Sequence, residues 1–88
     1  MKVVDDRNTE QKYSHYLAVL ATDRFLSGWG LAEGGNSYIA FACRPEDLQA
    51  TFRKIQNRND LMRIRVVDLR NYRPNPKYCK HLHIYLAD

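Results

Sequence analysis

The stretch that decides the fold is Tyr16-Leu17-Ala18-Val19-Leu20-Ala21, in a chain of 88 residues. It is apolar at every position and short, which is typical of a strand that is covered on both faces or lies at the centre of a sheet. Residues 37–43 form a second such segment, in which Ile39 and Phe41 alternate with smaller side chains at Ala40 and Ala42. This alternation predicts an antiparallel partner for the first strand.

A helix is predicted after the second strand. Pro45 suits the first position of a helix, and the two carboxylates that follow it suit the positive end of the helix dipole. We expect this helix to extend to about Arg58. Its apolar side chains at Leu48, Phe52 and Ile55 recur at helical spacing and predict one buried stripe.

Two more strands are predicted in the C-terminal half, over residues 62–68 and 81–86. Alternation predicts that their inward side chains are Met62, Ile64 and Val66 in the first and Leu82, Ile84 and Leu86 in the second. The simplest assembly is a small single α+β domain of order ββαββ, with a mainly antiparallel sheet and one helix packed on one face. We expect residues 15–88 to form this domain and residues 1–14 to form a polar tail or arm, in which Val3 and Val4 suit a short edge strand.

Composition narrows the class of protein. Hydrophobic residues make up 44% of the chain and charged residues 27%, as in folded proteins that bury a core. No apolar run approaches the roughly 18 residues that cross a bilayer, and residues 1–14 are too polar for a signal peptide. Two cysteines far apart fit reduced thiols. We therefore expect a cytoplasmic protein without membrane contact, cofactor or enzymatic activity.

The net charge of +4 is unevenly distributed. Residues 1–43 carry four basic and five acidic side chains, whereas residues 44–80 carry ten basic and four acidic ones. A small basic protein of this kind favours a polyanion or an acidic protein surface as its partner. Charge alone does not choose between these two partners.

A glycine-rich connection is the first candidate for a binding surface. All four glycines and Trp29 fall within residues 28–35. The connection between the first two strands is far longer than the roughly 4 to 6 residues usual in compact domains, and loops of such length are often functional. An exposed Trp29 would indicate a protein partner, because tryptophan is enriched at interface hot spots. The alternative is that Phe25, Leu26 and Trp29 fold back over the core.

The sheet face away from the helix is a second candidate. If strands 62–68 and 81–86 are neighbours, this face carries Arg63, Arg65, His81, His83 and Tyr85. Such a row of cationic and aromatic groups suits partner binding, although it also suits the ordinary polar side of a half-buried sheet. An uncovered face on so small a domain also allows a homodimer.

The loop over residues 70–80 interleaves cations with tyrosines, a composition that contacts phosphates and stacks on unpaired bases. It supports an alternative function as a nucleic-acid-binding module. The residues that would make these contacts are Arg63, Arg65, Arg70, Arg73, Lys77 and Lys80.

Cys79, His81 and His83 form the one cluster with metal-ligand chemistry, and strand alternation would place them on one face. No fourth ligand is evident, and structural zinc sites use four, so an incidental arrangement is the favoured interpretation. Nucleophilic catalysis by the same residues lacks an orienting third group.

A resemblance rests on three segments, residues 21–30 (Ala-Thr-Asp-Arg-Phe-Leu-Ser-Gly-Trp-Gly), residues 62–67 and residues 81–85. Their order resembles that of small orphan proteins encoded by phages, prophages and plasmids. The resemblance implies a protein that acts stoichiometrically on a host defence or replication complex, a protein or protein–nucleic acid assembly, as anti-CRISPR proteins do. The partner-binding residues that we predict are Asp23, Arg24, Phe25, Trp29, Arg63, Arg65 and Tyr85.

Overall fold

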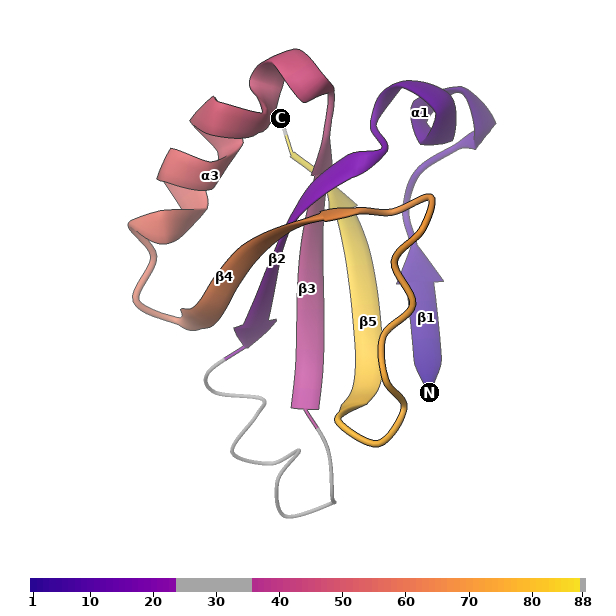
Figure 1. Ribbon diagram of the computed structural model, residues 1–88, viewed down its shortest axis with the longest axis vertical. Coiled ribbons are helices and arrows are strands. Elements are labelled where there is room, and N and C mark those ends of the chain that lie inside the picture. Colours follow the sequence, from indigo (N-terminus) through magenta and orange to yellow (C-terminus); the bar gives the residue numbers. More distant parts are fainter. Residues whose placement is uncertain (24–35, 88) are drawn as a thin grey trace.

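A computed structural model describes residues 1–23 and 36–87. Within these residues the chain forms one sheet with two α-helices and a short 3-10 helix (Figure 1). The elements follow in the order β1 (Lys2–Asp5), α1 (Thr9–Ser14), β2 (Leu17–Asp23), β3 (Asn36–Cys43), η1 (Pro45–Asp47), α3 (Leu48–Gln56), β4 (Leu61–Asp68) and β5 (Cys79–Leu86). The predicted α+β class is confirmed, with a βα unit added before the predicted elements.

The sheet has the strand order β1-β5-β3-β2-β4. In the described residues β2 pairs antiparallel with β3 and β4, whereas β5 pairs parallel with β3 and β1. The supposition that the last two strands are neighbours is therefore wrong, because β3 and β2 separate β5 from β4. Strands β3, β4 and β5 run in the same direction, so the chain crosses the sheet twice, through α3 between β3 and β4 and through residues 69–78 between β4 and β5.

The position of β2 confirms the central strand predicted for residues 16–21. It is paired along both edges, and Ala18, Val19, Leu20 and Ala21 are fully buried. Side chains point alternately to the two faces of a strand, so β2 contributes to two separate hydrophobic clusters. Leu20 belongs to one of them and Val19 to the other.

Helix α3 covers one face of the sheet, where it packs mainly on β2 and β4. Of the predicted buried stripe, Ile55 is buried in the cluster that contains Val19 and Ala21, whereas Leu48 and Phe52 are half-buried and pack against it. The stripe is therefore confirmed as the face that meets the sheet. The helix lies at the β4 end of the sheet, and β1 lies at the opposite end (Figure 1). The face of β5 on the same side is therefore left outside the footprint of α3.

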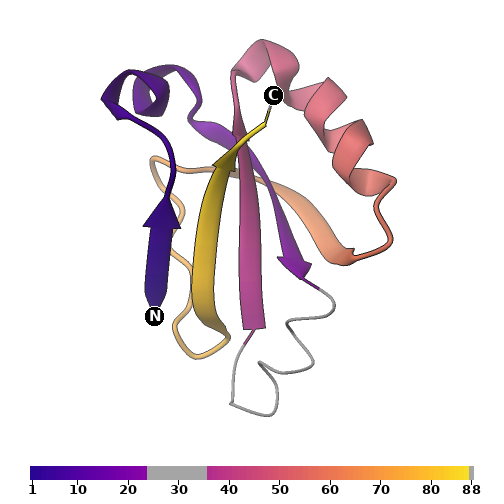
Figure 2. The same ribbon diagram turned by 180° about the vertical axis from the view of Figure 1, so that it is seen from behind.

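The face away from α3 is not free, contrary to our expectation. Residues 69–78 cross it on their way from β4 to β5, in front of β3 and β5 in Figure 1 and behind them in Figure 2. Leu69 and Tyr72 pack against the cluster that contains Leu20, Leu82 and Ile84. The crossover segment, residues 69–78, thus serves as the second layer that a helix would otherwise provide.

Strand β4 departs from the predicted alternation. Leu61 and Ile64 both pack beneath α3, and Val66 is 45% exposed. Arg63 lies between the first two with a φ of 54°, and the pairing with β2 shifts register at this point. The extra residue of this bulge breaks the period of two, so the prediction that Met62, Ile64 and Val66 share the inner face is wrong.

Residues 1–14, expected as a polar tail or arm, form β1 and α1, and the edge strand predicted at Val3 and Val4 is confirmed. Asn8 and Gln11 form a capping box that starts α1. The guanidinium of Arg7 binds the carboxylate of Asp5 at 2.9 Å and donates to the carbonyl oxygen of His15 at 2.7 Å. Burial raises the pKa of Asp5, but the bonds from Arg7 outweigh it and hold this pKa below its usual value. Of the helices in the described residues, none has the length and apolar character needed to cross a membrane.

Candidate functional site

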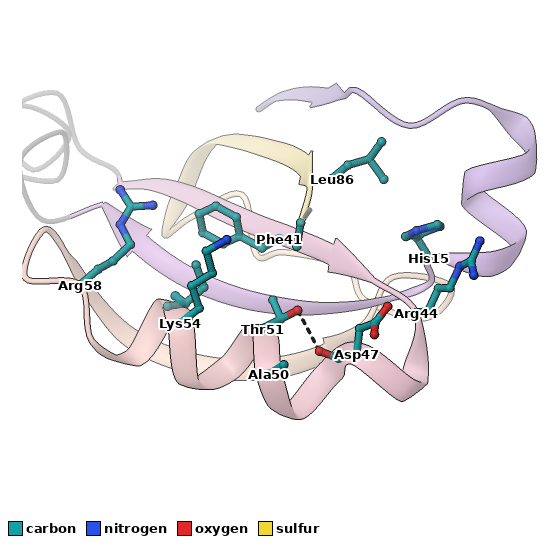
Figure 3. A pocket seen from close by; sticks show the side chains of 11 residues that line it. His15, Phe41, Arg44, Asp47, Ala50, Thr51, Lys54, Arg58 and Leu86 are labelled. Carbon is teal, nitrogen blue, oxygen red and sulfur yellow. Dashed lines mark hydrogen bonds between the residues drawn. The ribbon is translucent and has the colours of Figure 1, made fainter.

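A groove of about 800 Å³ runs between α3 and the part of the sheet that α3 leaves uncovered. One wall is the side of α3, and the base is formed by β3 together with the end of β5 (Figure 3). The far end is bounded by His15, in the link between α1 and β2. Because this volume falls within the range of roughly 300 to 1,000 Å³ typical of ligand pockets, the groove is our candidate site.

The floor of the groove is apolar. Phe41 from β3, Ile55 from α3 and Leu86 from β5 meet there, together with Ala50. Ile55 is buried, whereas Phe41 and Leu86 are half-buried and so leave apolar surface open to the groove. These side chains can desolvate an apolar group that enters.

Cationic side chains surround this floor. Lys54 projects from α3, between Arg58 at one end of the groove and Arg44 at the other (Figure 3). The guanidinium of Arg58 lies 5.7 Å from the centre of the Phe41 ring. Asp47 is the one acidic residue among the residues described as lining the groove, so the local charge is positive.

One of these cations, Arg58, is held in place by a neighbouring carboxylate. Arg58 forms an ion pair with Asp60, and this bond raises the pKa of the guanidinium further above its usual value. Lys54 precedes Arg58 by one helical turn, so both side chains project from the same side. At the Arg44 end, the hydroxyl of Thr51 donates to the backbone oxygen of Asp47 at 2.9 Å and ties η1 to α3.

An aromatic row on β5 extends the groove toward β1. A smaller hollow of about 310 Å³ joins Phe41 and Arg58 to Tyr85. The rings of Tyr85 and His83 stack with centroids 3.8 Å apart, and Nε2 of His83 lies 2.7 Å from a carboxylate oxygen of Asp6. Tyr85 is 40% exposed and is the one predicted partner-binding residue that the described structure places at this site.

Arg63 and Arg65 do not join Tyr85 on one surface. The guanidinium of Arg65 lies 5.4 Å from the centre of the Tyr38 ring, on the face that the crossover segment covers. It also donates to the carbonyl oxygen of Arg63 at 2.9 Å. The predicted row of cations and aromatics on a single face is therefore wrong, because β4 and β5 lie in different halves of the sheet and the side chains of Arg65 and Tyr85 point to opposite faces.

The cations of the crossover segment make contacts within the chain. Arg70 forms an ion pair with Asp68 at 2.6 Å, and its guanidinium lies 3.9 Å from the centre of the Tyr16 ring. Arg73 is exposed and donates to the carbonyl oxygen of Tyr72. Two further predicted nucleic-acid contacts, Lys77 and Lys80, are also exposed.

Cys79 does not share a face with His81 and His83. The pairing of β3 with β5 shifts register near Cys79, and its side chain lies fully buried in the cluster with Leu82 and Ile84. Within the described residues no group of three or more histidine, cysteine or acidic side chains is arranged to hold a metal ion. Burial raises the pKa of Cys79 and that of Cys43, which keeps both thiols protonated at neutral pH.

Three of the predicted partner-binding residues, Arg24, Phe25 and Trp29, lie outside the described residues together with the rest of the glycine loop. Asp23 ends β2 at the edge of that gap and is half-buried. The predictions for this loop stay predictions.

Sequence reasoning missed the groove itself. The sequence analysis gave Arg44, Lys54 and Arg58 no role in binding. Lys54 and Arg58 are spaced one helical turn apart beside an apolar stripe, and this spacing was the available signal. The same pattern is also typical of an ordinary solvated helix face. The sequence does not reveal that α3 covers only part of the sheet, and the groove exists because of this partial cover.

Comparisons with family models, with curated proteins and with solved structures find no match to this chain. The functional argument therefore rests on the groove and its surroundings.

Proposed function

We propose that this protein is a non-enzymatic binding protein that acts stoichiometrically on a macromolecular partner through the groove beside α3. In the context that the resemblance to mobile-element proteins implies, the partner is a host defence complex and the protein is its inhibitor, as anti-CRISPR proteins are. The observation that carries the proposal is the combination of an apolar floor at Phe41 and Ile55 with a cationic rim.

An apolar centre within a polar rim is the usual anatomy of a protein interface. The floor excludes water around an inserted side chain, and the rim supplies charged groups that select and orient the partner. Arginine and aromatic residues are enriched in such surfaces, and here Arg58 and Tyr85 adjoin the same hollow. The groove and the aromatic row on β5 together offer a continuous surface of this kind.

The proposal is tested by affinity capture from nuclease-treated lysate of the bacterial host, with wild-type protein and two charge-reversal variants. Lys54→Glu reverses a rim charge, whereas Arg53→Glu makes the same change on the neighbouring helical residue, which does not line the groove. We expect Lys54→Glu to lose the captured complex by tenfold or more and Arg53→Glu to retain it. Equal retention by both variants would contradict the groove as the binding surface.

A second function, nucleic-acid binding, is favoured by one observation on the crossover segment. Tyr78 is 55% exposed, and the ammonium of Lys77 lies 5.7 Å from the centre of its ring. An exposed ring beside cations suits stacking on an unpaired base. This alternative predicts binding to an oligonucleotide of twelve thymidines that weakens steeply with salt and is lost on Tyr78→Ala. Salt-independent binding, or no binding, would count against it.

A further inference from the structure

We infer that the protein forms a symmetric homodimer in which the outer edges of two β1 strands pair antiparallel and join the two sheets into one. The surface involved is the backbone of β1 at the rim of the sheet, which lies outside the groove. Binding of a partner through the groove neither requires this dimer nor excludes it.

Strand β1 is an edge strand whose one neighbour, within the described residues, is β5. The two strands are parallel, and the N–H of Asp6 donates to the carbonyl oxygen of Ile84 at 3.0 Å. Backbone groups of alternate residues point to opposite sides of a strand, so those of Val4 also face β5, whereas those of Val3 and Asp5 face outward. Among the described elements, none lies beside this outer edge along the length of β1 (Figure 1, Figure 2). The edge thus presents two N–H groups and two carbonyl oxygens to another strand.

The opposite edge of the sheet, on β4, is less suited to such pairing. There the register with β2 shifts, and Arg63 lies at the bulge with a φ of 54°. A bulge and charges of one sign, here Arg63 and Arg65, hinder an edge strand from pairing with another chain. The pairs of β1 with β5 run without a shift, and Val3 is 52% exposed. Of the two edges, β1 is therefore the one that can accept a further strand.

The backbone of β1 fits a second copy of itself in one register, with the two-fold axis at Val4. In this register Val3 exchanges two hydrogen bonds with Asp5 of the second copy, and Asp5 does so with Val3, so both outward-facing residues of each strand are paired. An axis at Asp5 would place two Asp5 side chains directly opposite each other, and like charges in that position are unfavourable. An axis at Val3 would set Asp5 opposite Met1, beyond the end of β1.

The side chains favour the same register. Lys2, Val4 and Asp6 share one face of the strand. The axis at Val4 places Lys2 of each copy directly opposite Asp6 of the other, and opposite charges in cross-strand pairs stabilise a sheet. Nε2 of His83 lies 2.7 Å from one carboxylate oxygen of Asp6, so Lys2 approaches the carboxylate beside this contact. Between the two charged pairs, Val4 meets Val4 and apolar surface is removed from water. A second copy therefore complements the backbone, the charges and the apolar residue of β1 together.

Cysteine cross-linking of the full chain tests both the dimer and its register. The two Val4 residues form a non-hydrogen-bonded pair with Cα atoms about 4.5 Å apart, a separation that a disulfide spans. The two Val3 residues are offset by about 7 Å along the strands as well as by the strand spacing, which is too far for a disulfide. We expect Val4→Cys to form a disulfide-linked dimer in air at least tenfold faster than Val3→Cys. Random collision predicts the opposite order, because Val3 is exposed and Val4 is half-buried.

A second variant tests the backbone pairing without a new thiol. Val3→Pro removes an N–H that points away from β5 and leaves the bonds between β1 and β5 in place, and proline is tolerated in this position of an edge strand. Sedimentation velocity should show a concentration-dependent dimer for the wild-type protein. We expect the dissociation constant of that dimer to be tenfold or more higher for Val3→Pro, with an unchanged circular dichroism spectrum.

Three outcomes would overturn the inference. The first is a wild-type protein that sediments as a monomer at every concentration. The second is cross-linking of Val3→Cys as fast as that of Val4→Cys, which would exclude the axis at Val4. The third is a Val3→Pro variant that dimerises as tightly as wild type, which would place the contact elsewhere. Capture of a complex that depends on Lys54 would leave the binding function in place in each case.

Discussion

The two faces of the sheet carry similar chemistry but different structure. On the face crossed by residues 69–78, Arg65 lies over Tyr38 and Arg70 lies over Tyr16. On the α3 face, Arg58 lies over Phe41 at the border of an open groove. Both faces therefore combine cations with aromatic rings, and in the part of the chain that the structure describes the groove adjoins the cation and ring of the second face.

The difference comes from what covers each face. The crossover segment lies across its face and places Leu69 and Tyr72 on the core, so the apolar surface there is already buried. Helix α3 lies toward β4 and leaves the face of β5 outside its footprint. Cations on the first face thus contact aromatic rings within the fold, whereas those that line the groove are the ones that we propose to contact a partner.

The largest expected effect is a difference in the free energy of unfolding between two tyrosine variants, one on each face of the sheet. Tyr72→Ala removes a ring packed on the core, and we expect it to lower the free energy of unfolding by about 2 to 3 kcal/mol. Tyr85→Ala removes a ring that is 40% exposed, and we expect a loss below about 1 kcal/mol. Urea denaturation of both variants measures the difference.

The matched truncation of two tyrosines controls for residue type. Because the same atoms are deleted on each face, the comparison reports only their surroundings. Equal losses for the two variants would break the distinction between a closed face and an open one.

A smaller effect on stability is expected in residues 1–14, which form β1 and α1 beside β5. The side chain of Arg7 is 7% exposed and joins Asp5 to the carbonyl oxygen of His15, a residue at the end of the groove. Arg7→Ala removes the guanidinium donors from both acceptors, although the backbone N–H of residue 7 still donates to Asp5, so we expect a loss of about 1 to 2 kcal/mol. Hydrogen exchange should accelerate in β1 and α1 and stay unchanged in β4.

Lys12→Ala is the matched control, since Lys12 reaches the same carboxylate at 3.8 Å with an exposed side chain. We expect it to change stability by less than about 0.5 kcal/mol. Acceleration of exchange throughout the sheet in Arg7→Ala would show that the arm is part of one cooperative unit and does not open separately.

The smallest predicted effect is a gain. Arg63 adopts a φ of 54°, a left-handed conformation that disfavours residues with a side chain and suits glycine. Arg63→Gly should therefore raise the free energy of unfolding by up to about 1 kcal/mol, measured by thermal unfolding, without affecting capture of the partner. Loss of the captured complex in this variant would show that Arg63 takes part in binding, as the sequence analysis predicted.

The sequence predicted the elements whose residues repeat with a clear period. The apolar run in β2, the alternation in β3 and the stripe at Leu48, Phe52 and Ile55 each indicate which side chains share a face. The structure buries the run in β2 and Ile55, and packs Leu48 and Phe52 half-buried against the same cluster. The α+β class follows from these elements. Periodicity predicts the type of each element and the face of its side chains because it depends only on residues close together in the sequence.

The arrangement of the strands was beyond this reasoning. Alternation states which face a side chain occupies but does not say which strand lies beside it, so the separation of β4 from β5 was missed. The bulge at Arg63 changes the face of the residues around it, and no glycine marks it. The groove depends on the strand order, because it lies where α3 and β5 occupy different halves of the sheet.

The most direct test compares one lysine on each face in the bound protein. Lys54 lines the groove and Lys77 lies on the crossover segment, and both are exposed. Acetylation of the free protein and of the captured complex, followed by mass spectrometry, reports the reactivity of each lysine. The account predicts that the partner protects Lys54 and leaves Lys77 as reactive as in the free protein. Protection of Lys77 with unchanged reactivity of Lys54 would contradict it.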